Sequence, residues 1–248
     1  MGAIITLTTD FGTQDAYVAA MKGVILGINP GATLVDICHS IEPQNIAQAA
    51  FVIGTAYDYF PQDTIHVVII DPGVGSQRRA IALKTPRAFF VAPDNGVLSY
   101  VIGASPEEPQ AVALTNPKFW RHPVSSTFHG RDIFAPVAAH LSLGVPLEEF
   151  GEVIPSLFAF PMPHPRMGAN GELIGHIIHI DHFGNLITNV KKEDLPSGKL
   201  CLEIAGQRIE SLSTSYAAGD KLLAVLGSSG HLEIAAKNGS AAGLLGAK

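Results

Sequence analysis

The chain has 248 residues, of which 47% are hydrophobic and 15% are charged, and its formal net charge is −6 at pH 7. Soluble proteins carry about 25% charged residues, so this composition, with a mean hydropathy of +0.26, excludes a disordered chain and predicts extensive burial between subunits. The negative charge argues against nucleic acid or an anionic membrane as the main partner. No apolar run approaches the roughly 18 residues of a membrane span.

The N-terminus and the cysteines predict a cytoplasmic protein. Met1 to Ile5 leads directly into a strand-like segment, without the basic region or the small-residue cleavage site of a signal peptide. Cys38 and Cys201 are isolated and match no metal-binding pattern, so we expect reduced thiols.

Strand-like and helix-like segments alternate over the first two-thirds of the chain. Apolar residues at helical spacing predict a helix over 15–28, which Asn29-Pro30-Gly31 ends. Further helices are expected over 43–60 and 132–143, and strands over 3–8, 33–37, 64–70, 80–84 and 88–91. This alternation predicts an α/β domain with a largely parallel central sheet.

The pattern changes near residue 160. Four prolines between Pro155 and Pro165 predict a linker, because neither a helix nor a central strand tolerates them. The segments expected as strands beyond it are 172–180, 186–190, 200–205, 221–226 and 231–235. They predict a small all-β domain, either a sandwich or a barrel. The expected boundaries are an N-terminal domain over 1–160, a linker over 161–170 and a C-terminal domain over 171–248.

Three of the expected strands end in polar or glycine-rich loops. These loops are Asp10-Phe11-Gly12, Asp71-Pro72-Gly73-Val74-Gly75 and Asp94-Asn95-Gly96. Residues of these types also simply form turns. Ligands of open α/β sheets bind beyond the carboxyl ends of the strands, however, so the three loops together predict a shared pocket.

The loop that begins at Asp71 lacks the ending of a P-loop and the third glycine of a dinucleotide-binding fingerprint. It does place a carboxylate and an arginine on one short segment, a pair that either fixes a small polar molecule or forms a surface ion pair. His129 lies at a later strand-to-helix junction. A lone histidine is more often structural, but this location makes it a candidate for catalysis.

Two turns of the expected β domain are further candidates. Asp181–Asn185 is either a plain turn or a polar, aromatic edge that stacks on a planar base. Gly227–Gly230 is either a plain hairpin turn or a site for a carboxylate. No metal site is expected: His176 and His182 share a strand face but lie about 20 Å apart. Metalloprotease and α/β-hydrolase motifs are absent from the sequence.

Taken together, these loops resemble one known family. The motifs that carry the resemblance are, in chain order, Thr9-Asp10-Phe11-Gly12, Asp71-Pro72-Gly73-Val74-Gly75, Ala92-Pro93-Asp94-Asn95-Gly96, Thr127-Phe128-His129-Gly130-Arg131-Asp132, Asp181-His182-Phe183-Gly184-Asn185 and Ser228-Ser229-Gly230-His231-Leu232-Glu233-Ile234-Ala235. They are similar to those of the S-adenosyl-L-methionine hydroxide adenosyltransferases, which are relatives of the fluorinases and chlorinases. The resemblance spans nearly the whole chain.

The resemblance implies a fold, an assembly and an activity. The implied fold is an N-terminal α/β domain followed by a C-terminal β-barrel. The implied assembly is a homotrimer that binds substrate between one subunit's N-terminal domain and its neighbour's C-terminal domain. The implied reaction is hydrolysis of S-adenosyl-L-methionine to adenosine and L-methionine, with no cofactor and no metal.

The resemblance also implies roles for individual residues. Asp71, Arg78 and His129 match the set that holds and activates water, although Arg79 is adjacent and leaves the choice of arginine open. The implied substrate-binding residues are Asp10 for the ribose diol, Thr127 and Phe128 beside the ribose and the reactive carbon, Phe183, Asn185 and Tyr216 for adenine, Asp181 and Ser228 for the methionine amine and carboxylate, and Asn95.

This chemistry is physically consistent with a sulfonium substrate. The leaving group is a neutral thioether, so the main requirement is a nucleophile held in line with C5′. Arg78 would polarise the water, and either Asp71 or His129 would accept its proton. A halogenase on the same scaffold is the nearest alternative, but the charge of Asp71 opposes halide binding. A module that binds the substrate without turnover is a second alternative, although binding alone would not require the polar set.

Overall fold

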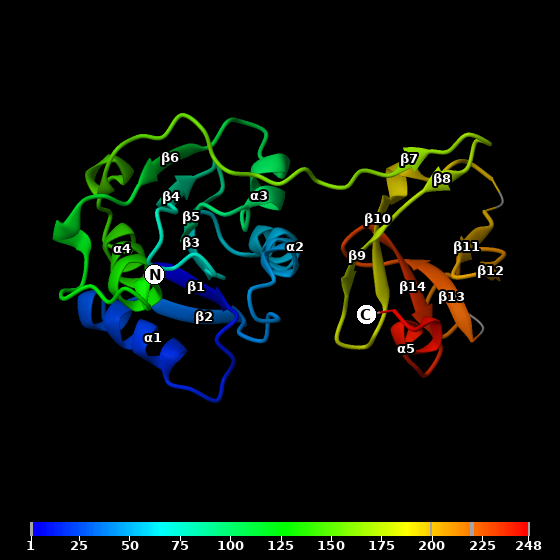
Figure 1. Cartoon of the computed structure of the whole chain (residues 1–248), viewed down its shortest axis with the longest axis horizontal. Coiled ribbons are helices and arrows are strands. Elements are labelled where there is room, and N and C mark those ends of the chain that lie inside the picture. Colours follow the sequence, from blue (N-terminus) through cyan, green and yellow to red (C-terminus); the bar gives the residue numbers. More distant parts are fainter. Residues whose placement is uncertain (1, 199, 219–220, 248) are drawn as a thin grey trace. The chain divides into compact units, whose positions relative to one another are not determined.

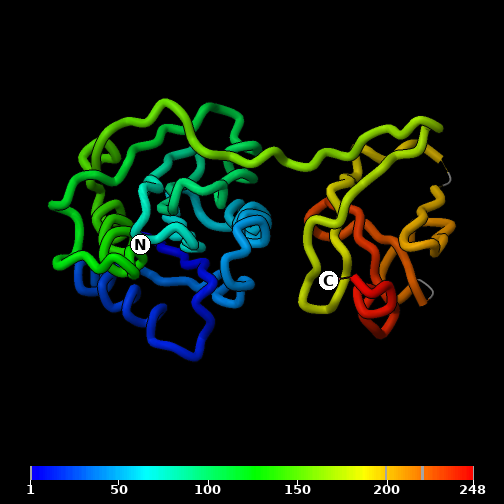
Figure 2. Tube along the Cα trace, viewed as in Figure 1, coloured from blue at the N-terminus to red at the C-terminus, as the bar shows by residue number. Residues whose placement is uncertain are grey.

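The computed structural model describes residues 2–198, 200–218 and 221–247 and divides into two compact units, Met1–Pro161 and Met162–Lys248 (Figures 1 and 2). The first unit is a mixed α/β structure, and the second consists mainly of antiparallel strands. The proline-rich segment 161–170 includes one short strand, β7 (Arg166–Met167).

A six-stranded sheet forms the centre of the first unit, in the order β2-β1-β3-β5-β4-β6. Four neighbouring strands of this sheet, β2, β1, β3 and β5, are parallel; β4 runs antiparallel to them, and β6, which pairs antiparallel with β4, runs in their direction again. The largely parallel sheet predicted from the sequence is therefore confirmed. The strands are β1 (Ile4–Thr9), β2 (Thr33–Cys38), β3 (Thr64–Ile69), β4 (Ala80–Lys84), β5 (Ala88–Pro93) and β6 (Gln110–Ala113).

Helices cover both faces of this sheet (Figure 1). Helices α1 (Tyr17–Ile28) and α4 (Ala135–Ser142) pack with Val67 and Ile69 in one apolar cluster. Helices α2 (Ile46–Ala56) and α3 (Ser99–Ala104) enclose Val68 and Ile70 in the other. Alternate residues of β3 and its extension thus enter opposite cores, which explains the continuous apolar run in the sequence.

The helices depart from the sequence prediction at their ends. The predicted helix 43–60 begins at Ile46, where the Asn45 side chain caps the first turn by accepting from the Gln48 N–H. It ends at Ala56 and continues as a 3₁₀ turn, Tyr57–Tyr59. The predicted helix 132–143 starts earlier, with a π-helical turn over Gly130–Phe134 that leads into α4.

Several short elements have no counterpart in the sequence prediction. They are α3 and β6 in the first unit, and β7, β12 and α5 in the second. Segments of two to six residues are too short to show a hydrophobic period, so pattern reading misses them. The remaining 3₁₀ turns are Pro117–Phe119, Leu147–Phe150 and Lys192–Asp194.

The second unit contains a four-stranded antiparallel sheet in the order β13-β14-β10-β9, with two-stranded ribbons β7-β8 and β11-β12. This confirms the predicted β domain. In the described pairings, β13 and β9 are the two edges of the sheet. The elements are β8 (Leu173–Ile174), β9 (Ile177–Ile180), β10 (Leu186–Lys191), β11 (Leu202–Ile204), β12 (Gln207–Ile209), β13 (Leu222–Leu226), β14 (His231–Ala236) and the short helix α5 (Ala241–Leu245).

Candidate active site

A cavity of about 290 Å³ opens in the first unit, where β1 and β3 end side by side. Its walls combine two of the three predicted loops with the segment before the π-helical turn. The carboxyl ends of parallel strands share one edge of the sheet, which is why residues far apart in sequence meet here. The polar and aromatic lining residues are Asp10, Phe11, Gln44, Asp71, Thr127, Phe128 and His129.

Asp71, Arg78 and His129 form one hydrogen-bonded group at this cavity. Arg78 donates from Nε to Asp71 Oδ1 at 2.9 Å and from a terminal nitrogen to Oδ2 at 2.5 Å. A terminal nitrogen of Arg78 also donates to His129 Nδ1 at 2.9 Å. The Asp71 and Arg78 side chains are only 6% and 11% exposed. A bidentate pair with so little solvent access is stronger and more rigid than a surface ion pair.

A glycine allows the loops that carry this group to approach each other. Gly75 has φ +77°, and a Cβ atom at this position would lie 2.5 Å from the carbonyl oxygen of Ser126. Any side chain would therefore push the loop after Asp71 away from the segment that carries His129. The Asp71–Arg78–His129 contact depends on this close approach.

The tautomer of His129 follows from its partner. A guanidinium has donors only, so Nδ1 of His129 must accept, and the proton of the neutral ring lies on Nε2. Burial lowers the pKa of His129 from its ordinary 6.5, and the positive charge of Arg78 lowers it further, against the opposing charges of Asp71 and Asp132. His129 is therefore neutral at pH 7 and offers an Nε2 N–H.

The structure distinguishes the two adjacent arginines. Arg79 donates to Asp94 Oδ2 at 2.8 Å from Nε, and to the Ser156 carbonyl at 2.9 Å. Arg78 instead bonds to Asp71 and His129, two residues that line the cavity, whereas Arg79 holds the chain near Ser156. The choice that the sequence left open falls on Arg78.

Asp10 lies across the cavity and is held by a backbone group. The N–H of Gln44 donates to Asp10 Oδ2 at 2.8 Å, and Gln44 has φ +66°, an uncommon conformation for a residue with a side chain. Gln44 lines the cavity but was not among the residues predicted from the sequence. No motif marks it there, because its position depends on the approach of the chain before α2 to the end of β1.

The apolar wall of the cavity is aromatic. Phe128 packs edge-to-face against Phe11 and Tyr17, with ring centroids 5.9 and 5.3 Å apart. Thr127 lies beside it, with its hydroxyl 3.2 Å from that of Ser125. The predicted residues Thr127 and Phe128 are thus in the cavity, next to His129.

Asn95 does not line this cavity. Its side-chain amide donates to the Ile70 carbonyl at 2.8 Å, and its oxygen accepts from the Val97 N–H at 3.2 Å. These contacts join the turn after β5 to the end of β3, one residue before Asp71. Asn95 therefore contacts the backbone one residue before Asp71 and does not reach the cavity.

In the second unit, the predicted residues gather on turns. Asp181 accepts through Oδ1 from the N–H groups of Phe183 and Asn185, at 2.9 and 2.8 Å. Its Oδ2 accepts from the Asn185 side chain at 2.8 Å. This bonding holds the turn between β9 and β10, and the ring of Phe183 is 73% exposed at its tip.

The Tyr216 side chain is held by Glu233, which was not among the predicted site residues. Its hydroxyl donates to Glu233 Oε2 at 2.6 Å, and burial together with Glu233 raises the pKa of Tyr216 to about 12. Glu233 is buried on β14, directly under Gly227 of the turn that carries Ser228: a Cβ atom on Gly227 would lie 1.7 Å from Glu233 Oε1. Glu233 stood in a recognised motif, but nothing in the sequence indicated a contact with Tyr216.

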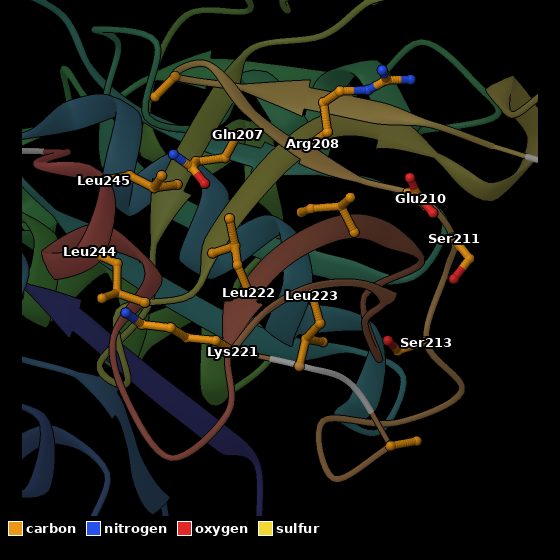
Figure 3. Close-up of a pocket in the computed structure, with 13 residues that line it drawn as sticks. Gln207, Arg208, Glu210, Ser211, Ser213, Lys221, Leu222, Leu223, Leu244 and Leu245 are labelled. Carbon is orange, nitrogen blue, oxygen red and sulfur yellow. The ribbon is translucent and has the colours of Figure 1, made fainter.

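A second cavity, of about 740 Å³, opens in the second unit (Figure 3). Its described lining combines leucines with Gln207, Arg208, Glu210 and Lys221. None of the predicted site residues is among these lining residues. The candidate catalytic residues therefore line the smaller of these two cavities.

Metal-binding clusters and membrane-spanning helices are both absent from the part of the chain that the structure describes. Within residues 2–198, 200–218 and 221–247, no group of three or more His, Cys, Asp or Glu side chains is arranged to hold a metal ion. Over the same ranges, no helix has the length and apolar character needed to cross a membrane.

Comparison with protein families extends this description. The α/β fold with a polar cavity at the carboxyl edge of its sheet defines a class of small-molecule sites. The family model for the SAM hydroxide adenosyltransferase N-terminal domain matches residues 5–151, and the model for the C-terminal domain of the same family matches residues 175–248. The chain belongs to the SAM hydroxide adenosyltransferase family, as its motifs suggested.

Individual relatives agree with this assignment. An (R)-S-adenosyl-L-methionine hydrolase from Salinispora tropica is 38% identical over 245 residues, covering 98% of this chain and 93% of the relative. One from Methanocaldococcus jannaschii is 42% identical over 199 residues, covering 77% and 68%. A fluorinase from an Actinoplanes species is 33% identical, covering 77% and 73%. A solved structure of an uncharacterized conserved protein from Thermotoga maritima matches with a TM-score of 0.90 at 36% identity, covering 98% and 96%.

Proposed function

We propose that this chain hydrolyses S-adenosyl-L-methionine to adenosine and L-methionine through attack of water at C5′. The observation that carries the proposal is the hydrogen-bonded Asp71–Arg78–His129 group, of which Asp71 and His129 line the cavity. Membership of the family supports it, as do the relatives named as hydrolases, which are 38% and 42% identical to this chain. The fluorinase is more distant, at 33%.

The reaction needs a placed nucleophile more than it needs an acid. The water oxygen forms a bond to C5′ as the C5′–S bond breaks, and the electron pair leaves with sulfur as a neutral thioether. Arg78 orients the water and stabilises the charge that develops on its oxygen. Holding water in line with C5′ supplies much of the barrier lowering.

Asp71 accepts the proton in this mechanism. The guanidinium of Arg78 uses one lone pair on each Asp71 oxygen, and a second lone pair remains on each. His129 has its acceptor nitrogen bound to Arg78, so its Nε2 N–H donates to the water and orients it. The alternative that the sequence left open, His129 as base, requires the ring to release Arg78.

Substrate binding divides between the two units. In the first, Asp10 binds the ribose diol, and Thr127 and Phe128 border the reactive carbon. In the second, Phe183, Asn185 and Tyr216 bind adenine, while Asp181 and Ser228 bind the amine and carboxylate of the methionine part. The exposed ring of Phe183 and the fixed ring of Tyr216 support this assignment, because both are available for stacking.

We further propose that Asn95 acts on substrate only through the backbone at Ile70, since its side chain is bonded there. The working form is a cytoplasmic homotrimer in which one subunit's N-terminal domain and a neighbour's C-terminal domain share the substrate. The low charged fraction of 15% and the free thiols of Cys38 and Cys201 support this form. Light scattering of the purified chain tests it, and a monomer of 26.1 kDa would contradict it.

No cofactor or metal takes part in the proposed reaction. Turnover that survives exhaustive treatment with a chelator is the expected result. Turnover that is lost and then restored by a divalent cation would refute this part of the proposal.

The configuration of the substrate at sulfur is part of the proposal. The names of the hydrolase relatives specify the (R) form, and L already specifies the amino-acid carbon, so the (R) centre is the sulfonium. We propose that this chain shares that preference. Separate assays with the two sulfonium epimers measure it, and equal kcat/KM for both would contradict it.

The decisive experiment uses ¹⁸O-labelled water with chloride present and mass spectrometry of the products. Adenosine that carries ¹⁸O at its 5′ oxygen is expected. A 5′-halogenated nucleoside would identify a halogenase instead. Binding measured by calorimetry with no product after a day would leave a binding module.

A further inference from the structure

Asp132 is a fully buried carboxylate close to the candidate site. It lies in the π-helical turn Gly130–Phe134, and its side chain is 0% exposed. It accepts from Arg131 at 2.7 and 2.8 Å, from the Ser125 N–H at 2.9 Å and from Arg121 at 3.2 Å. A charge with no solvent access persists only with such compensation.

These donors come from the beginning, middle and end of one loop. Arg121 begins the segment, Ser125 lies in its middle, and Arg131 lies two residues after His129 in the π-helical turn. The carboxylate therefore joins the start and the middle of the loop to the turn that ends it. The backbone adds a fourth tie, because the Arg121 N–H donates to the Asp132 carbonyl at 2.8 Å. Thr127, Phe128 and His129 lie between these bonded residues in the sequence, and all three line the cavity.

The same network reaches the aromatic wall. The guanidinium of Arg131 lies 5.1 Å from the centroid of the Phe128 ring, in position for a cation–π contact. Arg131 is itself oriented by its two bonds to Asp132. The carboxylate therefore fixes the backbone of the loop and, through Arg131, one face of Phe128.

Asp132 also contributes to the electric field at His129. The charged groups that act on His129 are Arg78 and Asp71 from the segment after β3, and Asp132 from its own turn. Asp10 lines the same cavity from the end of β1. Asp132 and Asp71 raise the pKa of His129, against the effects of burial and Arg78.

We propose that Asp132 is a positioning residue for the reaction: it ties the loop 121–129 to the π-helical turn and so places His129 and Phe128 at the cavity. Asp132 does not line the cavity and acts through its contacts with Ser125, Arg121 and Arg131. This inference rests on the proposed hydrolysis, because the placement matters only if His129 orients the attacking water.

A matched pair of variants tests it: Asp132→Asn and Asp94→Asn. Asp94 is also a buried carboxylate, with its side chain 3% exposed, and it also accepts from an arginine, Arg79, and from a backbone N–H, that of Phe158. It does not line the cavity. The two substitutions therefore remove the same kind of charge from the same unit, one at the loop that carries His129 and one away from it.

Both variants are expected to lower the midpoint of thermal unfolding. Only Asp132→Asn is expected to lower kcat, by about tenfold to a hundredfold, the scale of a catalytic group displaced by about 1 Å. It is also expected to move the acid limb of kcat/KM to lower pH, because the charge that raises the pKa of His129 is gone. Equal kcat and equal pH profiles in the two variants would overturn the inference.

Two additions keep the test decisive. If Asp132→Asn does not fold, Arg121→Gln replaces it. The Arg121 side chain is 46% exposed, so the fold tolerates its loss. This variant should reduce kcat by about threefold, and an unchanged kcat would overturn the inference. The His129 ring is also titrated by NMR, assigned with His129→Gln. Wild-type protein without turnover refutes the proposed function alone, whereas a His129 titration unmoved by Asp132→Asn refutes the positioning.

Discussion

The two units carry their candidate residues in different ways. In the first unit, Asp71, Arg78 and His129 are bonded to one another across up to 51 residues of sequence, and the ion pair is nearly buried. In the second, Asp181 bonds only to residues up to four positions further on, and Phe183 is exposed.

This difference separates two tasks of an enzyme. A group that must hold water within a few tenths of an ångström needs partners from several elements and little solvent. Groups that bind the outer parts of a substrate can lie on turns, as Asp181 and Phe183 do, although Tyr216 is also held by Glu233 on β14. We therefore expect changes in the Asp71–Arg78–His129 group to act on kcat and changes in the turns of the second unit to act on KM.

The largest effect should come from breaking the buried group. Arg78→Ala, Asp71→Ala and His129→Ala should each reduce kcat by about a hundredfold or more, the range seen for lost acid–base or oxyanion contacts. Arg79→Ala is the matched control, because Arg79 bonds to Asp94 and Ser156 instead. It should lower thermal stability and leave kcat within about twofold. Steady-state kinetics of the four variants decide it, and equal loss in Arg78→Ala and Arg79→Ala would contradict the assignment.

A smaller effect is expected when the support of Tyr216 is removed. Tyr216→Phe deletes the hydroxyl that donates to Glu233 and keeps the ring, and Glu233→Gln changes the acceptor. Both should raise KM by about threefold to tenfold with kcat nearly unchanged, since a typical intramolecular hydrogen bond contributes about 0.5–1.5 kcal/mol. A fall in kcat without a change in KM would remove the distinction between the units.

Phe183→Ala should raise KM by about fivefold, the lower end of what base stacking contributes. The ring is 73% exposed, so its loss should not change stability measurably. Stacking on a planar base is worth about 1–3 kcal/mol, so affinity for adenosine should weaken as well as affinity for the full substrate. Calorimetric titration with adenosine measures this, and unchanged affinity would place adenine elsewhere.

A last effect concerns stability and not activity. His66 is buried on β3 with Nδ1 2.7 Å from the Thr6 hydroxyl, and burial lowers the pKa of His66 to about 4. The unfolded chain takes up this proton near pH 6.5 and the folded chain only near pH 4, so stability should fall as pH drops between these values, by up to about 3 kcal/mol.

Urea unfolding at pH 4 to 7 measures this loss. The chain has a single tryptophan, Trp120, in the first unit, so its fluorescence reports on that unit. His66→Gln should flatten the slope between pH 4 and 6.5. A slope unchanged by this substitution would assign the acid sensitivity to other groups.

Sequence patterns predicted some parts of this protein well for identifiable reasons. The run 64–70 was predicted as a buried strand because apolar side chains fill both faces of β3. Asp71 was flagged because it follows that strand directly. Elements without a period, such as α3 and β6, were missed, and the start of the helix predicted at 132 was wrong because the π-helical turn begins at Gly130.

The sequence by itself determined the class of fold, the family and most of the candidate residues, because these depend on local periodicity and on motifs read along one chain. Tertiary structure decided which arginine meets Asp71, that Asn95 bonds to backbone, and that Gln44 bonds to Asp10, Glu233 to Tyr216 and Asp132 to Ser125. Each of these contacts joins segments whose separation and direction are set by the packing of strands and loops. A hydrogen bond depends on the distance and angle between donor and acceptor, and the order of residues along the chain specifies neither.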